Sequence, residues 1–164
     1  MYSGEIGYSE ERLQDLLNEF RLKEIRVFKI KAKPLTSLTL CLSKLNKAAL
    51  ETRIRHLGLE QFRRLKKAEI IDLLSDYYIE FENVEKVVSW ATEAEISILK
   101  SLMRENFIEV TVEAFPELFN HLRYLFITGL IHVFEDIENR FIFALQDEIK
   151  AILDVLDWSK ISVL

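Results

Sequence analysis

Apolar residues recur along most of this chain at the spacing of amphipathic helices. Near the N-terminus a stripe at i, i+3, i+4 and i+7 follows the N-cap Ser9 and predicts a packed helix of about three turns. The stripe consists of Leu13, Leu16, Leu17 and Phe20. Residues 28–33 alternate instead between apolar and lysine positions up to Pro34, which predicts a short edge strand. Its lysines are typical of a protected sheet edge, and phosphate binding is the alternative interpretation. Residues 35–42 fit either a strand or a helix.

Two shorter apolar stripes, joined by a basic loop, predict a helical hairpin at residues 42–78. The first opens at the N-cap Asn46 and ends at Gly58, whose backbone freedom is typical of helix ends. The second starts near Lys66 and carries its acids opposite the apolar stripe. Facing apolar stripes and a short connection predict that the two helices pack together.

After Phe81 the chain becomes acidic, and its pattern predicts helix, short strand, helix, two-stranded hairpin and closing helix. A capping box opens the first helix, Pro116 fits the first turn of the second, and Gly129 stops it. The expected ranges are a first helix from the capping box 92–95, a strand at 107–112, a second helix at 113–128, hairpin strands at 130–135 and 140–145, and a closing helix at 149–156.

Charge is distributed unevenly along the 164 residues, whose formal net charge is −5. Residues 21–67 contain fourteen Lys or Arg against three acids, a balance of +11, so the rest of the chain carries −16. Phosphate binding depends on charges within roughly 10 Å, about one Debye length, rather than on the net charge of the protein. The basic segment therefore favours a nucleic-acid partner, and solvated cations that keep a small domain soluble are the alternative.

The helical hairpin resembles a known family of small nucleic-acid-binding modules. Three segments carry the resemblance: residues 45–50 (LNKAAL), the turn 57–59 (LGL) and residues 65–74 (LKKAEIIDLL). They are similar to the N-terminal domain of the transcription terminator Rho and to the related SAP-type helix-extended-loop-helix modules. In those families a Lys-x-Glu-Leu-Ile run opens the second helix, and residues 67–71 (KAEII) match it except at Ile70. The resemblance covers about a quarter of the chain and implies nucleic-acid binding, often weak, through positive charge around the loop and helix ends.

The basic residues around this loop are the candidate nucleic-acid contacts. A loop that leads into a helix N-terminus combines side-chain charge with free backbone N–H donors. Arg63, Arg64, Lys66 and Lys67 are therefore expected to be the main phosphate contacts. The full candidate set is Lys44, Lys47, Arg53, Arg55, Arg63, Arg64, Lys66 and Lys67.

The second half of the chain looks like an abbreviated winged helix, with residues 125–134 (LFITGLIHVF) resembling the final helix and first wing strand. Winged helices often bind DNA through a helix in the major groove. Here the corresponding helix, 113–128, has Arg123 as its only Lys or Arg, which gives little counterion release. This half is therefore expected to contact protein or act as a scaffold. If this half binds protein, Phe134, Phe141 and Phe143 are the residues most expected to be exposed, because a two-stranded ribbon has one uncovered face; full burial of the three rings would indicate ordinary packing instead.

The sequence contains no signal for catalysis, a cofactor or a metal site, since it lacks a Gly-rich phosphate loop, a nucleophile elbow and closely spaced Cys and His. Cys41 is the single cysteine and is expected to pack as a small hydrophobe in a reducing cytoplasm. No apolar run approaches the roughly 20 residues of a membrane span. Residues 1–11 carry acids and lack the apolar core of a signal peptide.

The expected protein is α-rich α+β, with a basic Rho-N/SAP-like module at residues 1–81 and an acidic winged-helix-like module at 84–164. The expected function is non-catalytic nucleic-acid binding in a transcription context, with neither DNA nor RNA favoured and no membrane or small-molecule partner. Two alternatives stay open. In one, the helical hairpin docks on protein, as LEM-type relatives of this small fold do. In the other, the chain is the front part of a longer protein, because residues 157–164 end apolar and abruptly.

Overall fold

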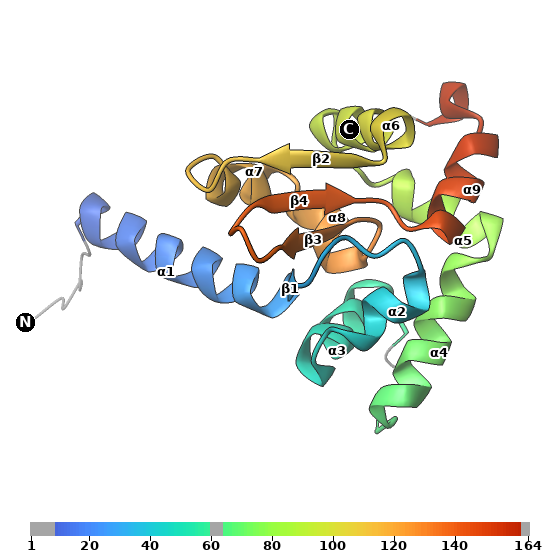
Figure 1. Cartoon of the computed structure of the whole chain (residues 1–164), viewed down its shortest axis with the longest axis horizontal. Helices are drawn as coiled ribbons and strands as arrows, with labels where there is room; N and C mark the ends of the chain where they lie inside the picture. The colour runs from blue at the N-terminus through green and yellow to red at the C-terminus, as the bar shows by residue number, and fades with distance from the viewer. Residues whose placement is uncertain (1–8, 60–63, 162–164) are drawn as a thin grey trace, which may run out of the picture.

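A computed structural model describes residues 9–59 and 64–161, in which helices surround a small mixed sheet (Figure 1). The helices are α1 (Glu10–Phe28), α2 (Leu38–Ser43), α3 (Lys47–His56), α4 (Lys67–Tyr78), α5 (Phe81–Val88), α6 (Glu93–Glu105), α7 (Phe115–His121), α8 (Arg123–Thr128), α9 (Asp147–Val155) and a 3-10 turn at Trp158–Lys160. The strands are β1 (Lys29–Lys31), β2 (Phe107–Val110), β3 (His132–Glu135) and β4 (Phe141–Ala144). The sheet order is β1-β3-β4-β2, with β1 parallel to β3 and the other pairs antiparallel. The α-rich α+β class is confirmed.

The first helix is longer than predicted, and only its C-terminal end is packed. Ser9 caps it by accepting a hydrogen bond from the Arg12 backbone, and Ile25 and Phe28 are buried near the other end. The N-terminal part projects away from the rest of the molecule (Figure 1). The prediction that its apolar stripe is packed is wrong: Leu13, Leu16, Leu17 and Phe20 are all exposed.

The lysine strand lies at the edge of the sheet, as predicted. Within the described residues β1 pairs only with β3, and Ile30 lies opposite Phe134. Because β1 comes from the basic half of the chain and β3 from the acidic half, the two halves share one sheet. Buried residues from both sides of the expected boundary at 81–84, such as Leu50 and Phe143, belong to one continuous hydrophobic core. The expected boundary therefore does not separate two cores.

The predicted helical hairpin is formed by α3 and α4, which pack against each other. The Asn46 side chain accepts a hydrogen bond from the backbone of Ala49 at 2.9 Å and fixes the start of α3. At the other end Gly58 adopts a φ of 72°, which favours glycine. The ambiguous segment 35–42 is helical from Leu38 onward, where α2 begins, and α2 contacts α4.

The second half follows the predicted order of elements except for the additional helix α5, which the pattern did not predict, and for one further helix. The expected helix 113–128 is two helices, α7 and α8, separated at Leu122, whose φ of −107° and ψ of 14° leave helical geometry. The buried carboxylate of Glu95 accepts a hydrogen bond from the backbone N–H of Leu125 at 3.1 Å. The same N–H also donates to the carbonyl oxygen of Leu122 at 3.0 Å, so Glu95 shares a donor in the first turn of α8. Glu95 also closes the predicted capping box with Thr92.

The hairpin of β3 and β4 forms the centre of the sheet rather than an exposed wing. Helices α7 and α8 lie behind it in Figure 1, and Phe115 of α7 stacks on Phe141 with 4.2 Å between ring centroids. Phe134 and Phe143 are fully buried, and Phe141 is 9% exposed. A central hairpin has both faces covered, so the exposure that a protein-binding role of this half would require is not found at these three rings, and their burial is ordinary packing. They do not offer a surface to a protein partner.

Candidate functional site

Several of the predicted basic residues gather where α2 ends and α3 and α4 begin. Lys44 caps the end of α2, Lys47 is the first residue of α3, and Lys66 and Lys67 open α4; all four are exposed. The ammonium of Lys67 donates a hydrogen bond to the carbonyl oxygen of Ser43 at 3.1 Å. The start of α4 is thereby held beside the end of α2, so cations that are far apart in sequence share one surface.

The remaining exposed candidates are less closely grouped. The guanidinium of Arg55 donates a hydrogen bond to Thr52 Oγ1 at 3.1 Å on the surface of α3. Arg64 is exposed and precedes α4, whereas Arg63 lies outside the described residues. One predicted contact is partly neutralised, since Lys47 Nζ lies 3.8 Å from a carboxylate oxygen of Glu51.

Arg53 is a correction to the predicted set, because its side chain is fully buried. One guanidinium nitrogen donates to His132 Nε2 at 2.7 Å and another to the carbonyl oxygen of Phe126 at 3.2 Å. A side chain enclosed in this way cannot reach a phosphate. The sequence held a signal for this, since Arg53 is three residues after Leu50 and therefore lies beside the apolar stripe of its helix.

A chain of buried hydrogen bonds continues from this contact. Arg53 can only donate, so His132 Nε2 accepts and His132 Nδ1 donates to the side-chain oxygen of Gln146 at 2.6 Å. Gln146 in turn donates to the carbonyl oxygen of Leu35 at 3.1 Å. Burial, together with the charge of Arg53, holds the pKa of His132 well below its usual value. Burial also lowers the pKa of Arg53 to about 10, so Arg53 stays charged and His132 neutral near pH 7.

The edge strand contributes cations that the sequence interpretation assigned mainly to edge protection. Arg26, Lys29, Lys31 and Lys44 line an open hollow of about 470 Å³, whose remaining lining residue is Ile30. We call this hollow, with the four cations that line it, the basic groove. Lys29 also pairs with Glu135 of β3, but among the described residues no acid lines the groove itself. Because Lys44 belongs both to the groove and to the predicted set, the basic surface runs from the edge strand to the end of α2.

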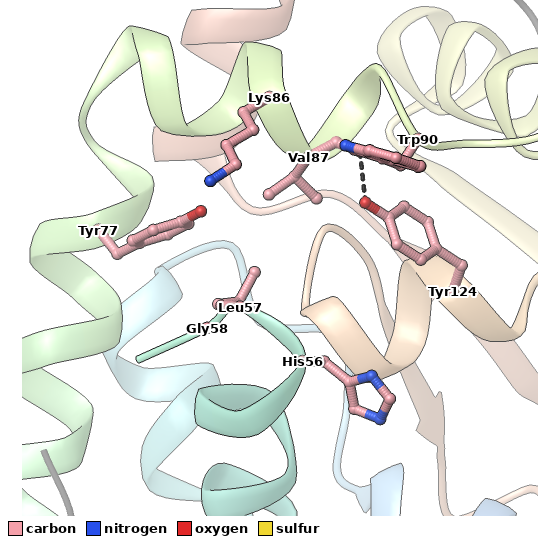
Figure 2. Close-up of a pocket in the computed structure, with 8 residues that line it drawn as sticks. All are labelled: His56, Leu57, Gly58, Tyr77, Lys86, Val87, Trp90 and Tyr124. Carbon is pink, nitrogen blue, oxygen red and sulfur yellow. Dashed lines mark hydrogen bonds between the residues drawn. The ribbon is translucent and has the colours of Figure 1, made fainter. Parts of the chain in front are cut away.

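A second hollow, of about 450 Å³, lies between the end of α3 and helices α4, α5 and α8 (Figure 2). In Figure 2 the ammonium of Lys86 points toward Tyr77, and the ring of Trp90 stands beside that of Tyr124. The Tyr124 hydroxyl donates to the carbonyl oxygen of Val87 at 2.6 Å, which fixes its ring. We call this feature the aromatic hollow; its lining residues are His56, Leu57, Gly58, Tyr77, Lys86, Val87, Trp90 and Tyr124.

The chemistry of the aromatic hollow suits a flat group that carries negative charge. Trp90 is 64% exposed, so its ring is accessible for stacking. Burial and the nearby charges of Arg123 and Arg55 lower the pKa of His56, which leaves Lys86 as the cation in the lining near pH 7. No pattern in the sequence predicts this hollow, because its aromatic residues come from α4, the turn after α5 and α8 and meet only in the folded chain.

No group of three His, Cys, Asp or Glu side chains is placed to hold a metal ion in the described part of the chain. No helix within the same residues is long and apolar enough to span a membrane. Comparison with known proteins finds no matching family model, no similar curated protein and no similar solved structure.

Proposed function

We propose that this protein binds nucleic acid, without catalysing a reaction on it, through the basic groove and the adjoining ends of α2 and α4. The observation that carries the proposal is the groove, where four cations, of which Lys29 also pairs with Glu135, line one open space with no acid of the described residues among them. Each phosphate that such cations neutralise releases condensed counterions, so a local basic surface binds nucleic acid even on an acidic protein. Lys67, held at Ser43 beside Lys44, extends the same surface to the helical hairpin.

The resemblance of residues 42–78 to Rho N-terminal and SAP-type modules is a second observation, separate from the groove, that supports the same proposal. In those modules the positive charge around the loop and helix ends binds nucleic acid, and Lys44, Lys66 and Lys67 occupy corresponding places here. The second half of the chain then serves as a scaffold, because its strand β3 holds the lysine strand β1 in place. A cytoplasmic role in transcription is the context that this reading implies.

The aromatic hollow favours single-stranded nucleic acid as the ligand. Bases of a single strand can leave their stack and lie on aromatic side chains, whereas bases of a duplex cannot do so without unpairing. Trp90 and Tyr77 offer aromatic rings, and the ammonium of Lys86 is available for an adjoining phosphate. The combination of aromatic rings and cations is the one by which single strands are bound without strong sequence preference.

A fluorescence-anisotropy titration of the intact protein tests this proposal. Labelled single-stranded and duplex DNA and RNA are titrated at low and at near-physiological salt, with an acidic polypeptide as a control for unspecific attraction of anions. We expect binding that weakens as salt rises and is tightest for single strands. Absence of salt-dependent binding to any nucleic acid, or equal binding of the acidic polypeptide, would overturn the proposal.

A further inference from the structure

The N-terminal part of α1 carries an apolar face that the described part of the protein leaves open. Leu13, Leu16, Leu17 and Phe20 are 46%, 43%, 50% and 60% exposed and follow one another at i, i+3, i+4 and i+7. They form one continuous stripe on the segment that projects from the body (Figure 1). Single exposed apolar residues are ordinary on protein surfaces, but a continuous apolar stripe marks an interaction surface.

Charge along α1 is divided between its two ends. Glu10, Glu11, Asp15 and Glu19 lie toward the N-terminus with Arg12 as the only cation there, whereas Arg21, Lys23 and Arg26 lie toward the C-terminus. The single acid of the C-terminal part, Glu24, is held by Arg123, with 2.5 Å between Oε1 and Nε. The helix is therefore negative at one end and positive at the other, in addition to being apolar along one side.

We propose that α1 pairs with α1 of a second copy of this chain in antiparallel orientation. Antiparallel pairing places the acidic end of each helix beside the basic end of the other, whereas parallel pairing places like charges together. The opposed helix dipoles favour the same orientation. The stripe therefore fits a second copy of this helix by both shape and charge, and the inference does not depend on the proposed function.

The spacing of the stripe also indicates a register. With the two-fold axis between Leu16 and Leu17, Leu13 faces the partner's Phe20, and the two central leucines of each helix meet at the axis. On one flank of the stripe, Glu10 then lies close to the partner's Arg21. The helix rises about 1.5 Å per residue, so the contact from Glu10 to Arg21 spans roughly 17 Å. A contact of this length falls at the small end of specific interfaces, and we expect a dimer with a dissociation constant in the micromolar range.

Dimerisation would place two basic grooves on one particle, because Arg26 lies on α1 and Lys29 directly follows it. Two linked sites on one nucleic-acid strand bind more tightly than either site alone.

Sedimentation equilibrium of the intact protein over a range of concentrations tests the pairing. We expect the average mass to rise toward that of two chains, and Leu17→Lys to hold the protein at the mass of one chain at every concentration. Leu22→Lys is the matched control, since Leu22 is 47% exposed on the same helix but lies off the stripe. Circular dichroism checks that each variant keeps its helical content.

A charge-reversal pair tests the orientation. Glu10→Lys and Arg21→Glu should each weaken the dimer several-fold, and the double variant should recover much of the loss because the pair is restored with opposite sign. A wild-type protein that stays at the mass of one chain overturns the inference. A dimer that survives Leu17→Lys, or is broken equally by Leu22→Lys, overturns the assignment to the stripe. Failure of the double variant to recover overturns the antiparallel register.

Discussion

The guanidinium of Arg53 donates a hydrogen bond to His132 Nε2 at 2.7 Å, joining helix α3 to strand β3 across 79 positions of the chain. Both side chains are buried, and neither pairs with a carboxylate in the described structure. The same guanidinium lies 5.5 Å from the centre of the Phe28 ring, at the end of α1. One buried cation therefore holds the helical hairpin, the first helix and the sheet together, which is why Arg53 serves the fold rather than a ligand.

Gly129→Ala is expected to lower the free energy of unfolding by more than Gly58→Ala. Both glycines have positive φ, 88° and 72°, so alanine is strained at either position by about 1–2 kcal/mol. A Cβ on Gly129 would also lie 3.1 Å from the Arg53 guanidinium, whereas nothing lies within 4 Å of a Cβ on Gly58. Urea unfolding of the two variants measures the difference. Equal losses would contradict the close packing of Arg53 against Gly129.

Acid is expected to destabilise the protein through His132. Its pKa in the folded protein is held well below the usual value of about 6.5, while the unfolded chain takes up the proton near that value. The contribution of His132 to stability is therefore complete above about pH 6.5 and is lost as the pH falls below it, by up to about 1.4 kcal/mol per pH unit. Urea midpoints measured across this range should show the loss.

His132→Gln should flatten that dependence, because glutamine does not titrate. His121→Gln is the matched control, since His121 lies exposed on α7. If His132→Gln kept the full acid sensitivity of the wild type, the buried network would not be its source.

Local sequence signals were sufficient for most elements of the fold. The cap at Asn46 and the capping box of Thr92 and Glu95 are made by neighbouring residues, so their helices begin where the pattern predicts. The lysine strand and the β3–β4 hairpin were likewise predictable from alternation and turn residues. The α-rich α+β class and the hairpin of α3 and α4 follow from these elements.

Features that depend on distant parts of the chain were not predictable in this way. The apolar stripe of α1 shows that one face is hydrophobic, but periodicity cannot tell what covers it. The break at Leu122 accompanies a hydrogen bond that the backbone N–H of Leu125 donates to the carboxylate of Glu95, 30 residues earlier in the chain. The basic groove joins Arg26 and Lys31 to Lys44 only in the folded chain, where their side chains line one hollow. The sequence therefore predicts the basic segment but not which of its cations share a surface.

A single-stranded oligonucleotide is expected to quench the fluorescence of Trp90 if a base stacks in the aromatic hollow. Trp158→Phe leaves Trp90 as the reporter, and duplex of the same sequence should quench it less because its bases stay stacked. Trp90→Phe should weaken single-strand affinity by about 1–2 kcal/mol, since phenylalanine keeps part of the stacking area. Equal quenching of the Trp90→Phe and Trp158→Phe variants would place the bases elsewhere.

The most direct measurement is the salt dependence of single-strand affinity in two matched triple variants. One carries Lys31→Ala, Lys44→Ala and Lys67→Ala on the basic surface. The other carries Lys100→Ala, Arg104→Ala and Lys160→Ala, which removes the same charge from exposed positions in the acidic half. Circular dichroism and urea unfolding serve as the check that both triple variants remain folded.

We expect the first variant to bind single strands more weakly than the wild type. The slope of its plot of log affinity against log salt concentration should be flatter by about 2 units, because three phosphate contacts no longer release counterions. The second variant should bind like the wild type. Equal slopes in the two variants, with both proteins folded, would contradict the assignment of nucleic-acid binding to the basic groove and the ends of α2 and α4.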